Sequence, residues 1–179
     1  DKNGFIDTYD QMAIGGTENP EIVYGFGVNL RWKELDFGAM FQGIGRTWRI
    51  LSSNIMPASN KGSMYNIFDN YQDRWTVDNQ SQDVFYPRAD YGPNANNSQK
   101  STWWLRNMSF LRLKNLELGY SCPKKWLQGF VISNARVFVR GTNLLTFSKF
   151  NLWDPELATG DGAKYPAMKS VSVGFDITF

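Results

Sequence analysis

Residues 170–179, SVSVGFDITF, alternate between apolar and small or polar side chains up to the last residue, Phe179. A period of two places successive side chains on opposite faces of a β-strand, so this stretch predicts a strand with one apolar and one polar face. Two kinds of fold use such strands. In a soluble β-sandwich the apolar face packs into a core, and in a membrane β-barrel it meets lipid.

Four further stretches alternate in the same way, and all of them predict strands. They are residues 22–31, 36–45, 110–120 and 134–145, and the last predicted strand runs from about residue 167 to residue 179. In the 110–120 stretch the apolar face changes phase after Leu113, which predicts a β-bulge at Lys114 or Asn115. We therefore expect an all-β fold with about five antiparallel strands.

The connections between these strands alternate between short and long. Residues 32–35 and 122–133 are short connections, the second with room for one helical turn, whereas residues 46–109 and 146–166 are long. If neighbouring strands are antiparallel, all short turns lie at one end and all long loops at the other, as in outer-membrane barrels. Compact soluble domains disfavour structureless loops of more than about 15 residues. The membrane barrel is therefore the favoured interpretation, and the soluble carbohydrate-binding β-sandwich is the alternative.

The expected organisation is an outer loop at residues 1–21, followed by barrel strands over residues 22–179 with extracellular loops at 46–109 and 146–166. Five strands cannot close a barrel, because the smallest membrane barrels have eight. The chain is therefore predicted to be the C-terminal portion of a larger transmembrane barrel. Its start at Asp1, without a methionine or a signal peptide, agrees with this expectation.

Composition limits the chemistry. The chain has 19 basic and 17 acidic residues, so no charge excess indicates nucleic-acid binding. It has no histidine, which excludes serine–histidine and cysteine–histidine nucleophiles, and Cys122 is its single cysteine, which excludes an internal disulfide. The carboxylates Asp154 and Glu156 could in principle serve a glycoside hydrolase, but no recognisable active-site motif surrounds them. We expect a protein that is not an enzyme.

Several motifs, in order along the chain, resemble the SusC/RagA type of TonB-dependent outer-membrane transporter. They are PEIVYGFGVNLRWKELDFGAMFQGIG (20–45), WTVDNQSQDVFYPR (75–88), STWWLRNMSFLRLKNLELGYSCP (101–123), RVFVRGTNLLTFSKFNLWDPE (136–156) and the ending YPAMKSVSVGFDITF (165–179). The resemblance covers nearly the whole chain.

The resemblance implies a 22-stranded barrel in the outer membrane, with its lumen blocked by a plug domain that this chain does not contain. It also implies uptake of oligosaccharides or peptides together with a SusD-like surface lipoprotein, driven by TonB acting on the plug. No cofactor is implied. The last strand resembles the signal read by the barrel-assembly machinery, carried here by Val173, Phe175, Ile177 and Phe179.

Three further sets of residues are candidates for particular roles. Arg136 and Arg140 are expected to face the lumen, with Arg112 as a possible third member. Tryptophans concentrate at membrane interfaces, so Trp32 and Trp126 are expected in the inner aromatic girdle, and Trp103 and Trp104 in the outer one.

The N-terminal segment resembles a calcium-binding loop of the family, although it is shorter and lacks the central Asp-Gly pair. Asp1, Asn3, Asp7 and Asp10 are its candidate oxygen ligands. A solvated polar turn is the alternative interpretation of this segment.

Overall fold

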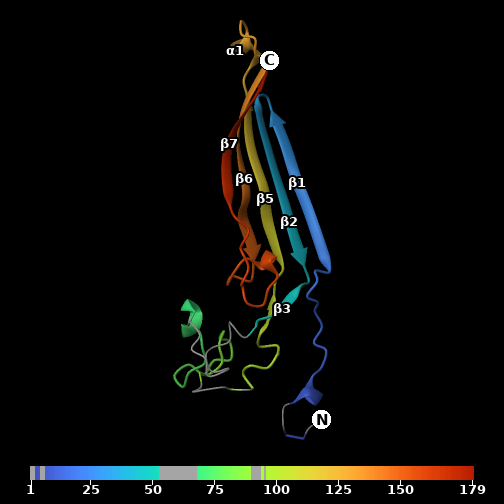
Figure 1. Ribbon diagram of the computed structural model, residues 1–179, viewed down its shortest axis with the longest axis vertical. Coiled ribbons are helices and arrows are strands. Elements are labelled where there is room, and N and C mark those ends of the chain that lie inside the picture. Colours follow the sequence, from blue (N-terminus) through green and yellow to red (C-terminus); the bar gives the residue numbers. More distant parts are fainter. Residues whose placement is uncertain (1–2, 5–6, 53–67, 90–93, 95) are drawn as a thin grey trace.

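The computed structural model describes residues 3–4, 7–52, 68–89, 94 and 96–179. Its main element is a five-stranded antiparallel sheet in the order β1-β2-β5-β6-β7. These strands are β1 (Ile22–Trp32), β2 (Leu35–Gly45), β5 (Phe110–Ser121), β6 (Asn134–Ser148) and β7 (Ser170–Thr178). They lie side by side as one long ribbon in Figure 1. The predicted all-β fold and its five strands are confirmed.

The short connections and the long connections lie at opposite ends of this sheet (Figure 1). Strands β1 and β2 are joined by Lys33 and Glu34 alone, and Lys33 adopts a φ of 55° to make the turn. Strands β5 and β6 are joined through a single helical turn, α1 (Lys124–Leu127). The C-terminus lies at this same end. No helix in the described part of the chain is long and apolar enough to cross a membrane.

Cross-strand pairing sorts the side chains onto an apolar face and a polar face, because paired residues point to the same side of a sheet. On the apolar face Phe26 pairs with Phe41, and their rings stack at 5.1 Å. On the polar face Glu117 pairs with Arg140. The apolar face is open along much of its length; Val173, for example, is 62% exposed. This sheet therefore does not enclose a core of its own, as a soluble sandwich would.

The predicted bulge lies at Lys114. In β5, Leu113 and Asn115 pair with the consecutive residues Phe41 and Met40 of β2, so Lys114 is the extra residue. The extra residue reverses the alternation, which allows Leu113 and Leu116 to lie on the same apolar face.

The long connections contain structure that the alternation pattern did not predict. β3 (Trp48–Ile50) pairs with β4 (Leu105–Asn107) in a second, two-stranded sheet. Short 3₁₀ helices occur in these connections at η3 (Asp69–Gln72) and η4 (Pro155–Leu157), and in the N-terminal segment at η1 (Thr8–Asp10). The loops bury a hydrophobic cluster, here called the outer-loop core. Its buried members are Leu51, Tyr86, Trp104, Met108 and Phe150.

Candidate functional site

An ion-pair network crosses the polar face of the sheet near its short-turn end. Arg136 of β6 is its centre: Nε lies 3.0 Å from Asp36 Oδ1, Nη2 lies 2.6 Å from Glu117 Oε1, and Nη1 lies 3.2 Å from Asp176 Oδ2. The other oxygen of Glu117 accepts from Arg140, with Nη2 at 2.6 Å. Two arginines and three carboxylates therefore connect β2, β5, β6 and β7.

Gly119 makes this network possible. It lies between Asp36 and Phe138 in the strand register, and a β-carbon there would contact the guanidinium of Arg136 and the carboxylate of Asp36. The absence of a side chain leaves the space in which the two charges meet across β5. The predicted pair Arg136 and Arg140 is thus brought together on one face, held by carboxylates of the same sheet.

A hollow of about 690 Å³ lies beside the network on the polar face. Its lining includes Gly25, Gly27, Gly38, Asn29, Asn115 and Arg140. The glycines leave the backbone uncovered, while the two amides and the half-exposed guanidinium supply hydrogen-bonding groups at its edges. The hollow can therefore accommodate another polypeptide segment or a polar solute close to the wall.

Arg112 lies on the same face but has a different role. Its side chain is 2% exposed and pairs with Asp154, and its Nη1 lies 2.8 Å from Glu156 Oε2. Lys114 Nζ lies 3.2 Å from Glu156 Oε1, and Asp154 also caps η4 by accepting from the Glu156 N–H. This clamp fastens the loop after β6 to the outer end of β5. Both carboxylates are therefore engaged in ion pairs with Arg112 and Lys114.

The outer-loop core explains where the tryptophans before β4 lie. Trp104 is 1% exposed, and its indole N–H donates to the Asn97 carbonyl at 2.8 Å. Trp103 packs against the same core and donates to the Phe85 carbonyl at 3.0 Å. A girdle residue faces lipid headgroups, so the prediction for Trp104 is wrong, and Trp103 is likewise part of the loop packing. Burial in this core raises the pKa of the Tyr86 phenol.

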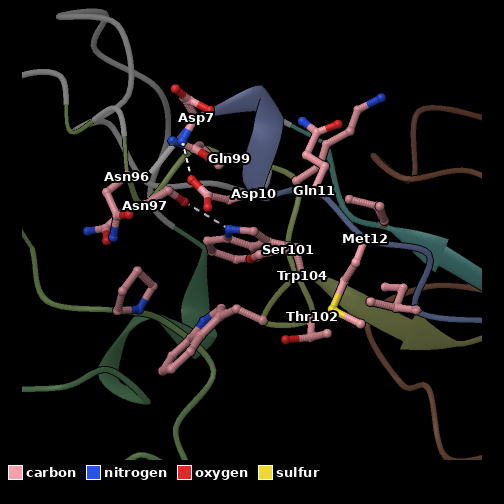
Figure 2. Close-up of a pocket in the computed structure, with 15 residues that line it drawn as sticks. Asp7, Asp10, Gln11, Met12, Asn96, Asn97, Gln99, Ser101, Thr102 and Trp104 are labelled. Atoms are coloured by element: carbon pink, nitrogen blue, oxygen red, sulfur yellow. Dashed lines mark hydrogen bonds between the residues drawn. The ribbon is translucent and has the colours of Figure 1, made fainter. Parts of the chain in front are cut away.

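A second cavity, of about 660 Å³, separates the N-terminal segment from the loop before β4. Figure 2 shows side chains of both segments around Trp104. Amide, hydroxyl and carboxylate groups dominate its polar lining, and Met12, Ile14 and Ile50 contribute apolar surface. Lys100 adds an ammonium group, so charged and neutral hydrogen-bonding groups line the cavity together.

Comparisons with known proteins identify the type of barrel. No sequence model of a known protein family matches the chain. It is 31% identical to TonB-dependent receptor P26 of Formosa agariphila, over 99% of this chain and 19% of the receptor. It is 33% identical to TonB-dependent receptor SusC of Bacteroides thetaiotaomicron, over 44% of this chain and 8% of SusC.

Solved structures agree. A structure of the RagAB peptide transporter is similar to this chain with 34% sequence identity and a TM-score of 0.72. The similarity covers 93% of this chain and 18% of the transporter chain. A structure of the RagAB peptide importer in the closed-closed state is similar with 32% sequence identity and a TM-score of 0.70. This similarity covers 99% of this chain and 20% of the importer chain. The chain belongs to the SusC/RagA type of TonB-dependent transporters. It spans about a fifth of the length of the first two curated relatives that it matches.

These SusC/RagA-type relatives are receptors and transporters rather than enzymes. The hydrolase interpretation of Asp154 and Glu156 is therefore not supported, and their binding to Arg112 and Lys114 gives them a structural role. Sequence reasoning noted both carboxylates and named Arg112 as a possible lumen residue. It missed their pairing, because contact between residues about 40 positions apart leaves no periodic signal.

The calcium ligands predicted from the family resemblance are only partly described. Asp1 lies outside the described residues. Asp7 and Asp10 form a capping box on η1, in which Asp7 Oδ1 accepts from Tyr9 N at 2.7 Å and Asp10 Oδ2 accepts from Asp7 N at 3.1 Å. Over residues 3–4, 7–52, 68–89, 94 and 96–179, no cluster of three or more acidic, histidine or cysteine side chains is arranged to hold a metal ion. The calcium site at Asn3 and its neighbours stays a prediction.

Three of the remaining predicted residues lie at the short-turn end. Trp32 and Trp126 are exposed there, and the Lys33 ammonium lies 5.0 Å from the centre of the Trp32 ring. Phe179 is exposed as well, next to Ser133, whose backbone N–H donates to the Thr178 carbonyl at 2.7 Å.

Proposed function

We propose that this chain forms part of the barrel wall of an outer-membrane importer that takes up oligosaccharides or peptides. The observation that carries the proposal is the pair of unlike faces on one sheet, apolar and open on one side, charged and glycine-rich on the other. A barrel wall needs this combination, because one face meets lipid and the other an aqueous interior. The similarity to RagAB supports the same assignment.

In this arrangement the polar face lines the lumen, and Arg136 and Arg140 point into it. The long loops and the outer-loop core lie outside the cell, and the short turns face the periplasm. Trp32 then lies at the periplasmic interface of the outer membrane. At the outer interface Tyr165, which is exposed just before β7, replaces Trp103 and Trp104 as the aromatic candidate.

The partners follow from the family. The parent protein would work with a SusD-like lipoprotein over its outer loops, and TonB would act through a plug domain in the part of the parent outside this chain. The apolar residues of β7, Val173, Phe175 and Ile177, together with Phe179, would be read by the barrel-assembly machinery. An exposed edge strand is a ready template for such pairing.

Uptake by cells tests the transport assignment. Cells that lack the parent gene should lose uptake of one ligand class when they are given fluorescent oligosaccharides and peptides separately. Complementation with the intact gene should restore uptake. Unchanged uptake of both classes would reject the importer assignment. Equal amounts of the transporter in the outer membrane, judged by its migration on unboiled gels, are the necessary control for any variant.

A further inference from the structure

The connection between β5 and β6 carries an exposed apolar surface that the transport assignment does not use. It protrudes beyond the β1–β2 turn at the short-turn end of the sheet (Figure 1). Trp126 is 66% exposed, Phe130 is 69% exposed and Val131 is 86% exposed. Residues 124–131 are called the basic tip below.

The basic tip carries only positive charge. Lys124 and Lys125 are both exposed, and residues 122–133, CPKKWLQGFVIS, contain no acidic residue. The β1–β2 turn at the same end differs, since its two residues are Lys33 and Glu34. Of the two connections at this end, the β5–β6 connection is thus the one that carries two lysines and no carboxylate.

The tip is also firmly attached to the sheet. At its start Cys122 N donates to the Ala135 carbonyl at 2.8 Å, and at its end Ser133 N donates to the Thr178 carbonyl at 2.7 Å. Both bonds fix the tip to the ends of β6 and β7, where the apolar face continues through Val137 and Ile177. The apolar surface of the tip therefore lies at the end of the sheet where these lipid-facing side chains end.

We propose that the basic tip is a membrane-surface anchor that inserts into the headgroup layer of the leaflet at the short-turn end. Trp126, Phe130 and Val131 occupy the interface between headgroups and acyl chains, where indole rings are preferred. Lys124 and Lys125 bind lipid phosphates, and their aliphatic stems lie along the apolar side chains. This role requires only a membrane-embedded barrel and does not depend on the transported substrate.

Lipid is the occupant that the charges favour. An anionic surface complements a tip with two lysines and no carboxylate, and each basic residue near such a surface contributes about a fivefold gain in binding. The neighbouring Trp32–Lys33 pair repeats the same combination of aromatic ring and ammonium at the same end.

Spin labels in the full-length transporter test this anchor. A nitroxide is attached at Val131→Cys or, as the matched control, at Val77→Cys, which replaces a valine that is 74% exposed in the outer loops. Cys122 is first replaced by serine, together with any cysteine in the rest of the transporter, and the labelled protein is embedded in nanodiscs of phosphatidylethanolamine and phosphatidylglycerol. Collisions with oxygen, which concentrates in lipid, are compared with collisions with a water-soluble nickel chelate.

We expect the label at position 131 to collide more with oxygen than with nickel, and the label at position 77 to show the reverse. A label at 131 that behaves like the one at 77 would overturn the anchor, because the tip would then be in water. Low collision rates with both reagents would also overturn it, because protein would then cover the tip.

A second measurement separates the lysines from the apolar side chains. With the label at position 131, the double variant Lys124→Glu and Lys125→Glu should lose oxygen collisions in discs that contain phosphatidylglycerol. The loss should be smaller in discs of phosphatidylcholine alone. Equal values for the variant and the parent in both lipids would contradict the proposed binding of phosphates.

Discussion

Replacing Asp154 with alanine should loosen the outer loops while leaving the barrel strands paired. Asp154 and Glu156 hold the guanidinium of Arg112, which is 2% exposed at the outer end of β5. The change removes one of the two carboxylates, and it also removes the cap on η4. The loop after β6 is then held to the strand chiefly through Glu156.

The magnitude follows from burial. Breaking a buried ion pair costs about 3–5 kcal/mol when the remaining charge is left alone. Arg112 retains Glu156 at 2.8 Å, so we expect about 2 kcal/mol here. Loss of the cap adds about 1 kcal/mol. The sum, about 3 kcal/mol, corresponds to a rise of about a hundredfold in the opening equilibrium of the loop.

Hydrogen–deuterium exchange of the folded transporter measures that equilibrium. Ser52 N donates to the Gly160 carbonyl at 2.8 Å, so its amide becomes exposed when the two loops separate. Its exchange should accelerate by about the predicted factor in Asp154→Ala. Lys114→Ala is the control: its ion pair with Glu156 is partly exposed, is worth less than about 1 kcal/mol, and should change exchange by no more than about fivefold. If the two variants exchange alike, the clamp does not hold the loop.

Three further changes test the sheet and the outer-loop core. Deleting Lys114 removes the bulge and moves half of β5 to the wrong face, so the folded species on unboiled gels should disappear, whereas Lys114→Ala should retain it. Gly119→Ala places a β-carbon against the side-chain ends of Arg136 and Asp36, which can move but then lose their ion pair, so it should lower the unfolding free energy by up to about 1 kcal/mol in thermal melts in detergent. Gly45→Ala, whose β-carbon would meet its nearest neighbour at 3.6 Å, should melt like the parent. Burial raises the pKa of the Tyr86 phenol above its usual value of about 10. The outer-loop core should therefore be fully stable below about pH 10 and lose stability as the pH rises through the raised pKa. Tyr86→Phe should remove the loss of stability that ionisation of this phenol causes, as measured by protease sensitivity between about pH 9 and pH 12.

The sheet could be predicted from the sequence because the two faces of each strand lie in different environments. A lipid-facing side and a polar side impose a period of two on 22–32 and 170–178, and even the phase change at Lys114 is visible in the order of the leucines. The outer-loop core could not be predicted in this way. Leu51, Tyr86 and Phe150 come from different connections, and no local period relates them. Trp104 was misplaced for the same reason, since position before a strand does not reveal whether a tryptophan turns toward lipid or toward other loops.

The two parts of the chain therefore depend on different surroundings. The sheet exposes its apolar face and ends in the edge strands β1 and β7, whose outer backbone groups have no partner strand within the described sheet. In hydrocarbon such groups must be paired, so the sheet requires the remaining strands of the parent as well as lipid. The outer-loop core buries its own aromatic side chains and is fastened to β5 by Arg112. A barrel built in this way can hold a shaped outer surface in place while its wall is stabilised by the membrane.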